Sequence, residues 1–457
     1  MASNKKNYEI DMCSGPILPK MLRFALPLML SSVLQLLFNA ADIIVVGRFA
    51  GDNSMAAVGS TSYLINLFVN LFVGISVGAN ILASRFYGAN DKEGLHETVH
   101  TSIMFSLLSG LLLAVFGSLS ARQLLILMQS PPEVLELATL YLRIYFLGMP
   151  AAMLYNFGAA LLRAVGDTKR SLYYLLFAGV VNVALNLVLV IFCHMDVAGV
   201  AIATLTSHCI SAALVLRCLI REPGAIHLEL RQIRIYKIRL KQILQVGVPA
   251  GLQSVLFALS NVVIQSSVNA FGEITVAGNT ASHNMEQFIY ACMTAFQQAV
   301  ISFVSQNLGA GNYKRIWKST LTALACVIAT GLPLSLLARL FAPQLLQIYS
   351  SSPEVLEAAL IRARLMLLLY VVPGLMEVVA GAVRGIGYSA LPMLVSLVGA
   401  CGLRLIWIAT VFQIPAYHNI STVYWSYPIS WCLTFVAHII CFLWGMKKLK
   451  NRLTLHT

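Results

Sequence analysis

Long apolar runs, each about as long as a lipid bilayer is thick, recur from one end of this chain to the other. An α-helix needs about 20 mostly apolar residues to cross the hydrocarbon core, and here 58% of residues are hydrophobic and only 11% are charged. The runs are continuous rather than alternating, which favours helices over a membrane β-barrel. We therefore predict an all-α integral membrane protein. Its twelve expected transmembrane helices are 24–46, 61–84, 99–120, 137–160, 171–193, 198–216, 243–268, 281–304, 317–340, 359–382, 390–412 and 427–446.

The distribution of positive charge predicts the orientation in the membrane. Lys and Arg are enriched in cytoplasmic loops, and an N-terminus inside the cell places most of the 31 Lys and Arg residues in inner loops. Both termini are then cytoplasmic. The net charge of +13 does not indicate nucleic-acid binding, because there is no soluble domain to carry a basic patch. The first 20 residues lack the apolar core of a signal peptide, so we expect the first run to remain as a membrane helix.

Short motifs recur at a nearly constant offset, which indicates an internal duplication. Pro27-x4-Ser-Val-Leu returns 222 residues later at Pro249, and Pro-Glu-Val-Leu-Glu occurs at 132–136 and at 353–357. Each copy holds an even number of spans, so the two copies share one orientation. We expect two six-helix lobes related by a pseudo-twofold axis along the membrane normal. The predicted domains are an N-terminal lobe 1–216, a basic cytoplasmic linker 217–242 and a C-terminal lobe 243–457 with a short cytoplasmic tail.

Three acidic residues, Asp42, Glu286 and Glu377, fall within the predicted spans. A carboxylate in hydrocarbon costs several kcal/mol unless it is paired, hydrated or protonated, so such a group is a functional candidate. The alternative is a neutralised structural pair. Glu286 and Arg404 lie at similar predicted depth, and we expect them to form an ion pair, either structural or functional. Glu377 lies seven residues before Arg384 and is a candidate cavity residue.

Other motifs are weaker evidence of function. Pro27 removes one hydrogen bond from the first helix and can kink it, either as a static bend or as a hinge. His96-Glu97-x-x-His100 has the spacing of a zinc-protease signature, but it offers no third ligand and has no counterpart in the second copy. We interpret it as the start of a helix with incidental histidines. The chain lacks the glycine-rich phosphate-binding loop G-x4-G-K-[ST], so we do not expect it to be an ATPase or another enzyme.

Several short motifs follow one another in a set order: Pro27, Asp42-x4-Gly47-Arg48, Gly88-Ala89-Asn90-Asp91, Arg163-x2-Gly166-Asp167, and Gln306-Asn307-x-Gly309-Ala310-Gly311. No single one is specific, but together they cover nearly the whole chain. With them the sequence resembles the multidrug and toxic compound extrusion (MATE) family, part of the multidrug/oligosaccharidyl-lipid/polysaccharide flippase superfamily. The resemblance implies a secondary antiporter that exports amphipathic, often cationic organic compounds in exchange for H⁺ or Na⁺ by rocking of its two lobes.

The resemblance also implies a coupling site in the first lobe. Asp42, Asn182 and Thr204 match the family pattern, whereas Asn186 replaces a second carboxylate with an amide. Asn182 and Asn186 are four residues apart, so they share one helix face. One carboxylate with amide and hydroxyl oxygens can hold Na⁺ or bind a proton. The alternative for Asp42 is a structural hydrogen bond between helices. Pro27 would be the hinge of a bending helix, and Glu377 lies about one turn from the position of a second-lobe acid in one family branch.

A lipid-linked precursor flippase of the same superfamily is the alternative function. Such proteins tend to have basic cavities for pyrophosphate, and Arg404 is the one mid-membrane cation that the sequence indicates, which disfavours this alternative. We expect a monomer in a bacterial-type inner membrane, with small organic substrates, no nucleic-acid partner and no cofactor beyond Na⁺ as a coupling ion.

Overall fold

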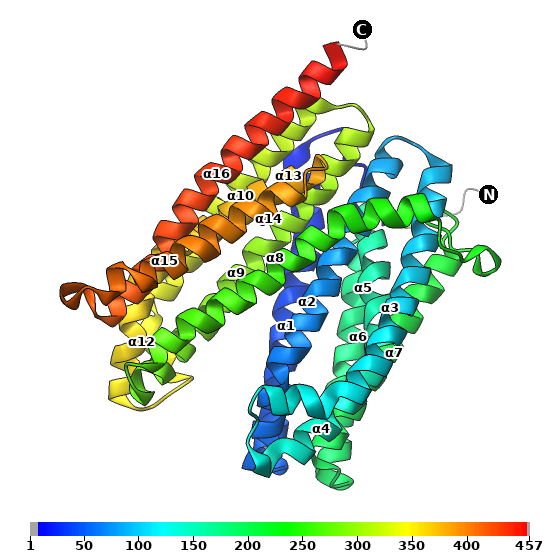
Figure 1. Ribbon diagram of the computed structural model, residues 1–457. Coiled ribbons are helices and arrows are strands. Elements are labelled where there is room, and N and C mark those ends of the chain that lie inside the picture. The colour runs from blue at the N-terminus through cyan, green and yellow to red at the C-terminus, as the bar shows by residue number, and fades with distance from the viewer. Residues whose placement is uncertain (1–7, 455–457) are drawn as a thin grey trace. The chain divides into compact units, whose positions relative to one another are not determined.

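The structure is a computed structural model that describes residues 8–454, and these residues form helices and no strand (Figure 1). The predicted all-α fold is therefore confirmed. The α-helices are α1 Ile17–Phe49, α2 Asp52–Gly88, α3 Lys92–Leu127, α4 Pro132–Leu147, α5 Met149–Ala164, α6 Lys169–Asn186, α7 Asp196–Arg221, α8 Lys237–Asn269, α9 Glu273–Gly309, α10 Tyr313–Leu340, α11 Ala342–Gln347, α12 Pro353–Met366, α13 Val371–Gly385, α14 Ala390–Ser396, α15 Leu403–Ala409 and α16 Ile420–Thr454.

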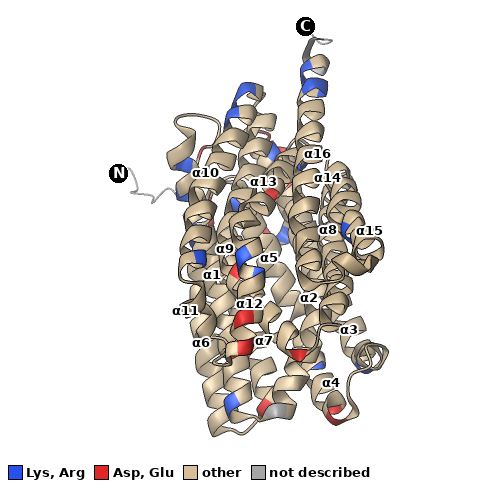
Figure 2. Cartoon of the chain, turned by 90° about the vertical axis from the view of Figure 1, so that its left-hand side faces the viewer, with Lys and Arg blue, Asp and Glu red and all other residues tan. Residues whose placement is uncertain are grey.

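The helices account for all twelve expected spans. Within the described residues, eleven helical stretches are long and apolar enough to cross a membrane, and the bent pair of α4 and α5 supplies the twelfth. That pair turns by 47° at Gly148, where Pro150 follows in the first turn of α5 and lacks a backbone N–H. Figure 2 shows that charged residues gather mainly toward the helix ends, as for α10 and α16.

The fifth and the eleventh spans, which correspond in the two copies of the repeat, each contain a turn of π-helix. In the fifth span α6 continues into Leu187–Phe192, and in the eleventh span α14 continues into Leu397–Gly402. A π-turn widens the helix by one residue, and such turns are common at functional sites. Asn186 is the last residue before the first of them. The local backbone irregularity therefore lies next to one of the predicted site residues.

The described chain divides into two compact units. Unit 1 comprises the described residues up to Asp11 together with Leu30–Gly251, and unit 2 comprises Met12–Met29 together with the chain from Leu252 onward. The divisions within α1 and α8 are 222 residues apart, which equals the offset of the repeat. The beginning of α1 thus groups with the second copy, and the beginning of α8 groups with the first. The lobe boundaries predicted from sequence stay a prediction.

Glycines lie at close helix contacts in unit 1. α3 packs on α4 and α5, and α6 packs on α7. Gly78 meets Gly247 at the beginning of α8, where an added Cβ on Gly78 would lie 2.8 Å from the Gly247 nitrogen. Gly74 meets Gly251 in the same way. Small residues at such crossings let two helix backbones approach closely inside a membrane.

Unit 2 holds the segment before α1 through the motif Gln306-Asn307. The Gln306 side chain accepts the Met12 N–H at 3.3 Å, and the Asn307 side chain donates to the Met12 carbonyl at 3.1 Å. Arg315 donates to the same carbonyl at 2.8 Å and to those of Ser14 and Gly15. These contacts satisfy the polar backbone of a segment that has no secondary structure of its own.

Candidate functional site

Four residues predicted to form a coupling site come together in unit 1. Asp42 lies on α1, about two turns before its end. Asn186 donates a side-chain N–H to the Asp42 carboxylate and lies 3.4 Å from the side-chain oxygen of Asn182. The Asn182 amide in turn lies 3.4 Å from the hydroxyl of Thr204 on α7. The order Asp42, Asn186, Asn182, Thr204 forms a single polar chain across three helices.

The site lies inside the helix packing rather than on an outer surface. Asn186 is 1% exposed and Asn182 is 5% exposed, whereas Asp42 is partly buried. The side-chain oxygen of Asn186 is buried without a hydrogen-bond partner. An unpartnered acceptor in such a place is costly, and it is the kind of group that a proton donor or a cation satisfies. The site therefore has one ionisable carboxyl group, surrounded by neutral side chains that carry oxygen atoms.

Sequence reasoning missed three aromatic neighbours of this site. Tyr141 and Tyr145 on α4 lie within electrostatic range of Asp42. The Tyr145 ring meets the His208 ring edge-on at 6.1 Å between centroids. His208 is one turn beyond Thr204 on α7, and its Nε2 atom is buried without a partner. The four-residue spacings from Thr204 to His208 and from Tyr141 to Tyr145 were the signal that could have found them.

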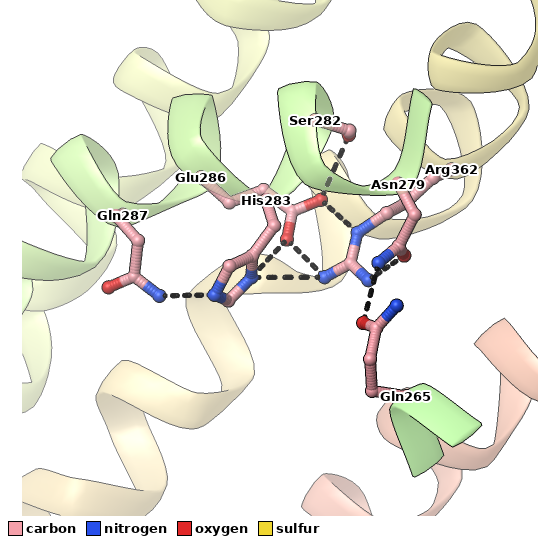
Figure 3. Close-up of polar contacts among 7 residues, drawn as sticks. All are labelled: Gln265, Asn279, Ser282, His283, Glu286, Gln287 and Arg362. Carbon is pink, nitrogen blue, oxygen red and sulfur yellow. Dashed lines mark hydrogen bonds and ion pairs between the residues drawn. The ribbon is translucent and has the colours of Figure 1, made fainter. Parts of the chain in front are cut away.

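Unit 2 corrects one prediction. Glu286 does not pair with Arg404 but with Arg362 on α12 (Figure 3). Arg362 donates to the two carboxylate oxygens of Glu286 at 3.0 and 2.6 Å, and to the side-chain oxygen of Asn279 at 2.7 Å. Ser282 donates to the same carboxylate at 3.2 Å. The prediction was wrong because depth along a span does not tell which helices are neighbours, and α9 packs on α12.

Arg404 lies instead in an aromatic environment. Its side chain is 2% exposed, its Nε donates to the Ser430 hydroxyl at 2.8 Å, and it makes no ion pair with a described residue. The guanidinium carbon lies 4.4 Å from the centre of the Tyr427 ring and 5.6 Å from that of Trp431. Arginine on aromatic faces is a stabilising cation–π arrangement. Arg404 is therefore a buried cation without a carboxylate partner in the part of the chain that the structure describes.

Glu377 and Arg384 both lie buried on α13. Glu377 accepts a hydrogen bond from the Gln297 side chain at 2.5 Å. Arg384 donates to the side-chain oxygen of Gln253 at 2.7 Å, and Gln253 donates to Ser396 at 3.1 Å. Neutral amides thus contact both charges, and the role of Glu377 as a cavity residue stays a prediction.

The remaining predicted features have local roles in the fold. Pro27 lies inside α1, two residues before the division between the units, and its role as a hinge stays a prediction. The His100 Nε2 atom accepts the backbone N–H of Glu229 at 3.1 Å, and Glu97 is paired with Arg239 at 2.8 Å. The second histidine and the glutamate of the protease-like motif therefore hold the linker. Among the described residues no three His, Cys, Asp or Glu side chains gather as metal ligands.

Comparisons with known proteins agree with this architecture. The MatE family model matches the chain twice, at residues 27–188 and 249–410, again 222 residues apart. A probable multidrug resistance protein of Bacillus subtilis, YoeA, is 29% identical over 93% of this chain and 94% of its own length. An FAD transporter of Shewanella oneidensis is 23% identical over 75% of this chain and 77% of its own length.

A solved structure has the same fold. It is described as the outward-facing conformation of a multidrug resistance MATE family transporter, and it superimposes with a TM-score of 0.89 over 96% of this chain and 98% of that one, at 23% identity. The two family matches together cover more than half of the sequence. This multi-pass membrane protein belongs to the MATE family of transporters.

Proposed function

We propose that the chain is a secondary active antiporter that exports amphipathic, often cationic organic compounds in exchange for an ion. The relative YoeA supports the substrate class, because it is named a probable multidrug resistance protein and aligns with this chain over nearly its whole length. The arrangement around Asp42 supports the coupling: its carboxylate contacts a neutral amide, and no cation among the described residues pairs with it. A carboxylate kept among apolar helices without a countercharge is most easily tolerated if it binds and releases an ion.

H⁺ is the coupling ion that this arrangement supports best. Asn186 directs its N–H toward Asp42, whereas a Na⁺ ion between the two side chains would need the Asn186 oxygen turned toward it. A proton can bind the second carboxylate oxygen of Asp42 without moving Asn186. Proton binding would change the charge at Asp42, and so it would favour one of two conformations of the protein. Rocking of two lobes between these conformations is the transport step that we propose.

The test is transport by the purified protein in liposomes with separately imposed gradients. We expect a pH gradient to drive uptake of a fluorescent organic cation, and a protonophore to stop it. A Na⁺ gradient alone should drive little uptake. The reverse dependence would assign Na⁺ to the site, and no uptake under either gradient would contradict antiport altogether.

One observation favours a second candidate, transport of anionic compounds. In unit 2, Glu286 neutralises Arg362, but Arg404 is buried and has no carboxylate partner among the described residues. A cation of this kind suits the phosphate or carboxylate of a flippase-like or nucleotide-like substrate. Competition distinguishes the candidates: an anionic amphiphile should inhibit uptake of the fluorescent cation only weakly if the first proposal holds.

A further inference from the structure

A cavity of about 590 Å³ lies in unit 1, away from the Asp42 site, between the beginning of α6 and the end of α7. Arg170 and Tyr174 line it from α6, and Arg217 and Arg221 line it from α7. Tyr8 and Glu9, from the segment before α1, complete its wall. The coupling mechanism uses none of these residues.

Only some of the charged side chains at this cavity have hydrogen-bond or ion-pair partners among the described residues. Arg170 donates to Glu222 at 2.5 Å, pairs with Asp167 and lies 5.1 Å from the centre of the Tyr8 ring. Glu9 accepts the hydroxyl of Tyr87 at 3.0 Å. The acids at the cavity therefore already have donors.

Arg217 and Arg221 have no such partners within residues 8–454. Both are exposed, and neither makes a hydrogen bond or an ion pair with a described residue. They are four residues apart on α7, so their side chains lie one above the other on the same face. Two like charges at this spacing repel each other. An anion between them would remove the repulsion, and the planar guanidinium group matches phosphate oxygens in paired hydrogen bonds.

The surface beside the cavity suits the acyl chain of a lipid. An apolar stripe on α6 runs away from Arg170 through Tyr173, Phe177 and Val180, and each of these side chains is more than half exposed. Their spacing keeps them on one side of the helix. α6 is part of a membrane span, so an acyl chain can lie along this stripe while its headgroup reaches the arginines.

We propose that this cavity binds the headgroup of an anionic phospholipid, with Arg217 and Arg221 holding the phosphate and the α6 stripe contacting an acyl chain. The cavity is at the end of unit 1 that is predicted to face the cytoplasm. Basic pockets between membrane helices on that side are a recognised class of site for anionic lipids.

The test is lipid binding to the purified full-length protein, measured by native mass spectrometry during titration with phosphatidylglycerol in mixed micelles. We expect phosphatidylglycerol to bind more tightly than phosphatidylcholine. The double variant R217Q/R221Q should weaken phosphatidylglycerol binding by about ten-fold or more, because each interfacial cation contributes on the order of 1 kcal/mol.

The matched control is R231Q/K237Q, which removes two exposed positive charges outside the cavity. It should bind phosphatidylglycerol within about two-fold of the unchanged protein. If the double arginine variant does not fold, R217Q and R221Q are tested singly, and each should weaken binding. Equal losses in both double variants would show general attraction between charges and would overturn the proposal. Full displacement of phosphatidylglycerol by the same concentration of inorganic phosphate would also overturn it, because the site would then recognise free phosphate.

Discussion

Asp42 of unit 1 and Glu286 of unit 2 are acids within the membrane spans that are held in opposite ways. In unit 1, Asp42 contacts the neutral amide of Asn186. In unit 2, Glu286 is fully buried and receives two hydrogen bonds from Arg362. Of these two acids, one has no countercharge among the described residues and the other has a permanent one; the third acid, Glu377 of unit 2, contacts the neutral amide of Gln297.

Because of this difference, the two acids differ in how readily they can bind a proton. Protonating Glu286 would leave the Arg362 charge buried and unpaired, which is costly in low dielectric. Protonating Asp42 leaves only neutral neighbours, and the Asn186 hydrogen bond can persist. An exchangeable proton or ion therefore suits Asp42, whereas Glu286 is suited to joining α9 to α12. Four changes to the chain test this contrast.

The largest effect is expected from Asp42→Asn. The amide has nearly the same volume and keeps a hydrogen bond with Asn186, but it cannot bind a proton at physiological pH. We expect efflux of a fluorescent cation from energised cells to fall to background while the amount of folded protein is unchanged. Glu136→Gln is the control, since it removes an acid from the exposed pair with Arg122. Efflux at the unchanged rate in the Asp42 variant would remove this residue from the mechanism.

The second change separates structure from transport in unit 2. Arg362→Met leaves Glu286 buried without its partner and should cost about 3–5 kcal/mol of stability. The double variant Glu286→Leu/Arg362→Met removes both charges and should recover most of that loss. Thermal unfolding in detergent measures both. If the double variant folds but no longer transports, then Glu286 has a coupling role and the contrast between the units fails.

The third change gives unit 1 a second acid. Asn186→Asp places two carboxylates in contact, and a cation between them relieves their repulsion. We expect Na⁺ to bind about ten-fold more tightly, because additional carboxylate ligands raise the affinity of oxygen sites for hard cations. Stabilisation against heat by Na⁺, compared with K⁺, measures this. The exchanged variant Asp42→Asn/Asn186→Asp, which again has one carboxylate, should lose the gain.

The sequence predicts relations within a helix better than relations between helices. Asn182 and Asn186 share a face because the α-helical repeat dictates it, and the structure brings them together with Asp42. The partner of Glu286 could not be found in the same way. Depth along the spans indicated Arg404, and only the packing of α9 on α12 identifies Arg362 as the partner.

The pattern of apolar residues also did not predict the irregularities of the backbone. Hydropathy predicts the fourth span as one run, but it does not predict the 47° bend at Gly148. It likewise does not predict the π-turn that follows Asn186. Both features depend on which carbonyl groups find donors in the folded protein. The repeat predicted the duplication, yet the grouping of the first parts of α1 and α8 with the opposite copies depends on tertiary contacts.

The smallest effect is expected from Arg239→Gln, which tests a partly exposed ion pair against the fully buried one of unit 2. The side chains of Arg239 and Glu97 are 20% and 22% exposed, compared with 5% and 0% for Arg362 and Glu286. Water screens such a pair, so its loss should cost no more than about 1 kcal/mol. Arg239 also lies 4.6 Å from the centre of the Phe86 ring, and Arg239→Lys should keep part of the interaction.

Limited trypsin digestion at the exposed linker residues Arg231 and Arg234 measures this effect, because the pair helps to hold the linker on α3. A loss of up to 1 kcal/mol predicts cleavage about two- to five-fold faster for Arg239→Gln, with Arg239→Lys between it and the unchanged protein. A much larger acceleration would mean that the Glu97–Arg239 pair stabilises unit 1 as much as the Glu286–Arg362 pair stabilises unit 2. No acceleration would leave the hydrogen bonds from Glu229 to His100 and from Tyr236 to Thr101 as the contacts that hold the linker.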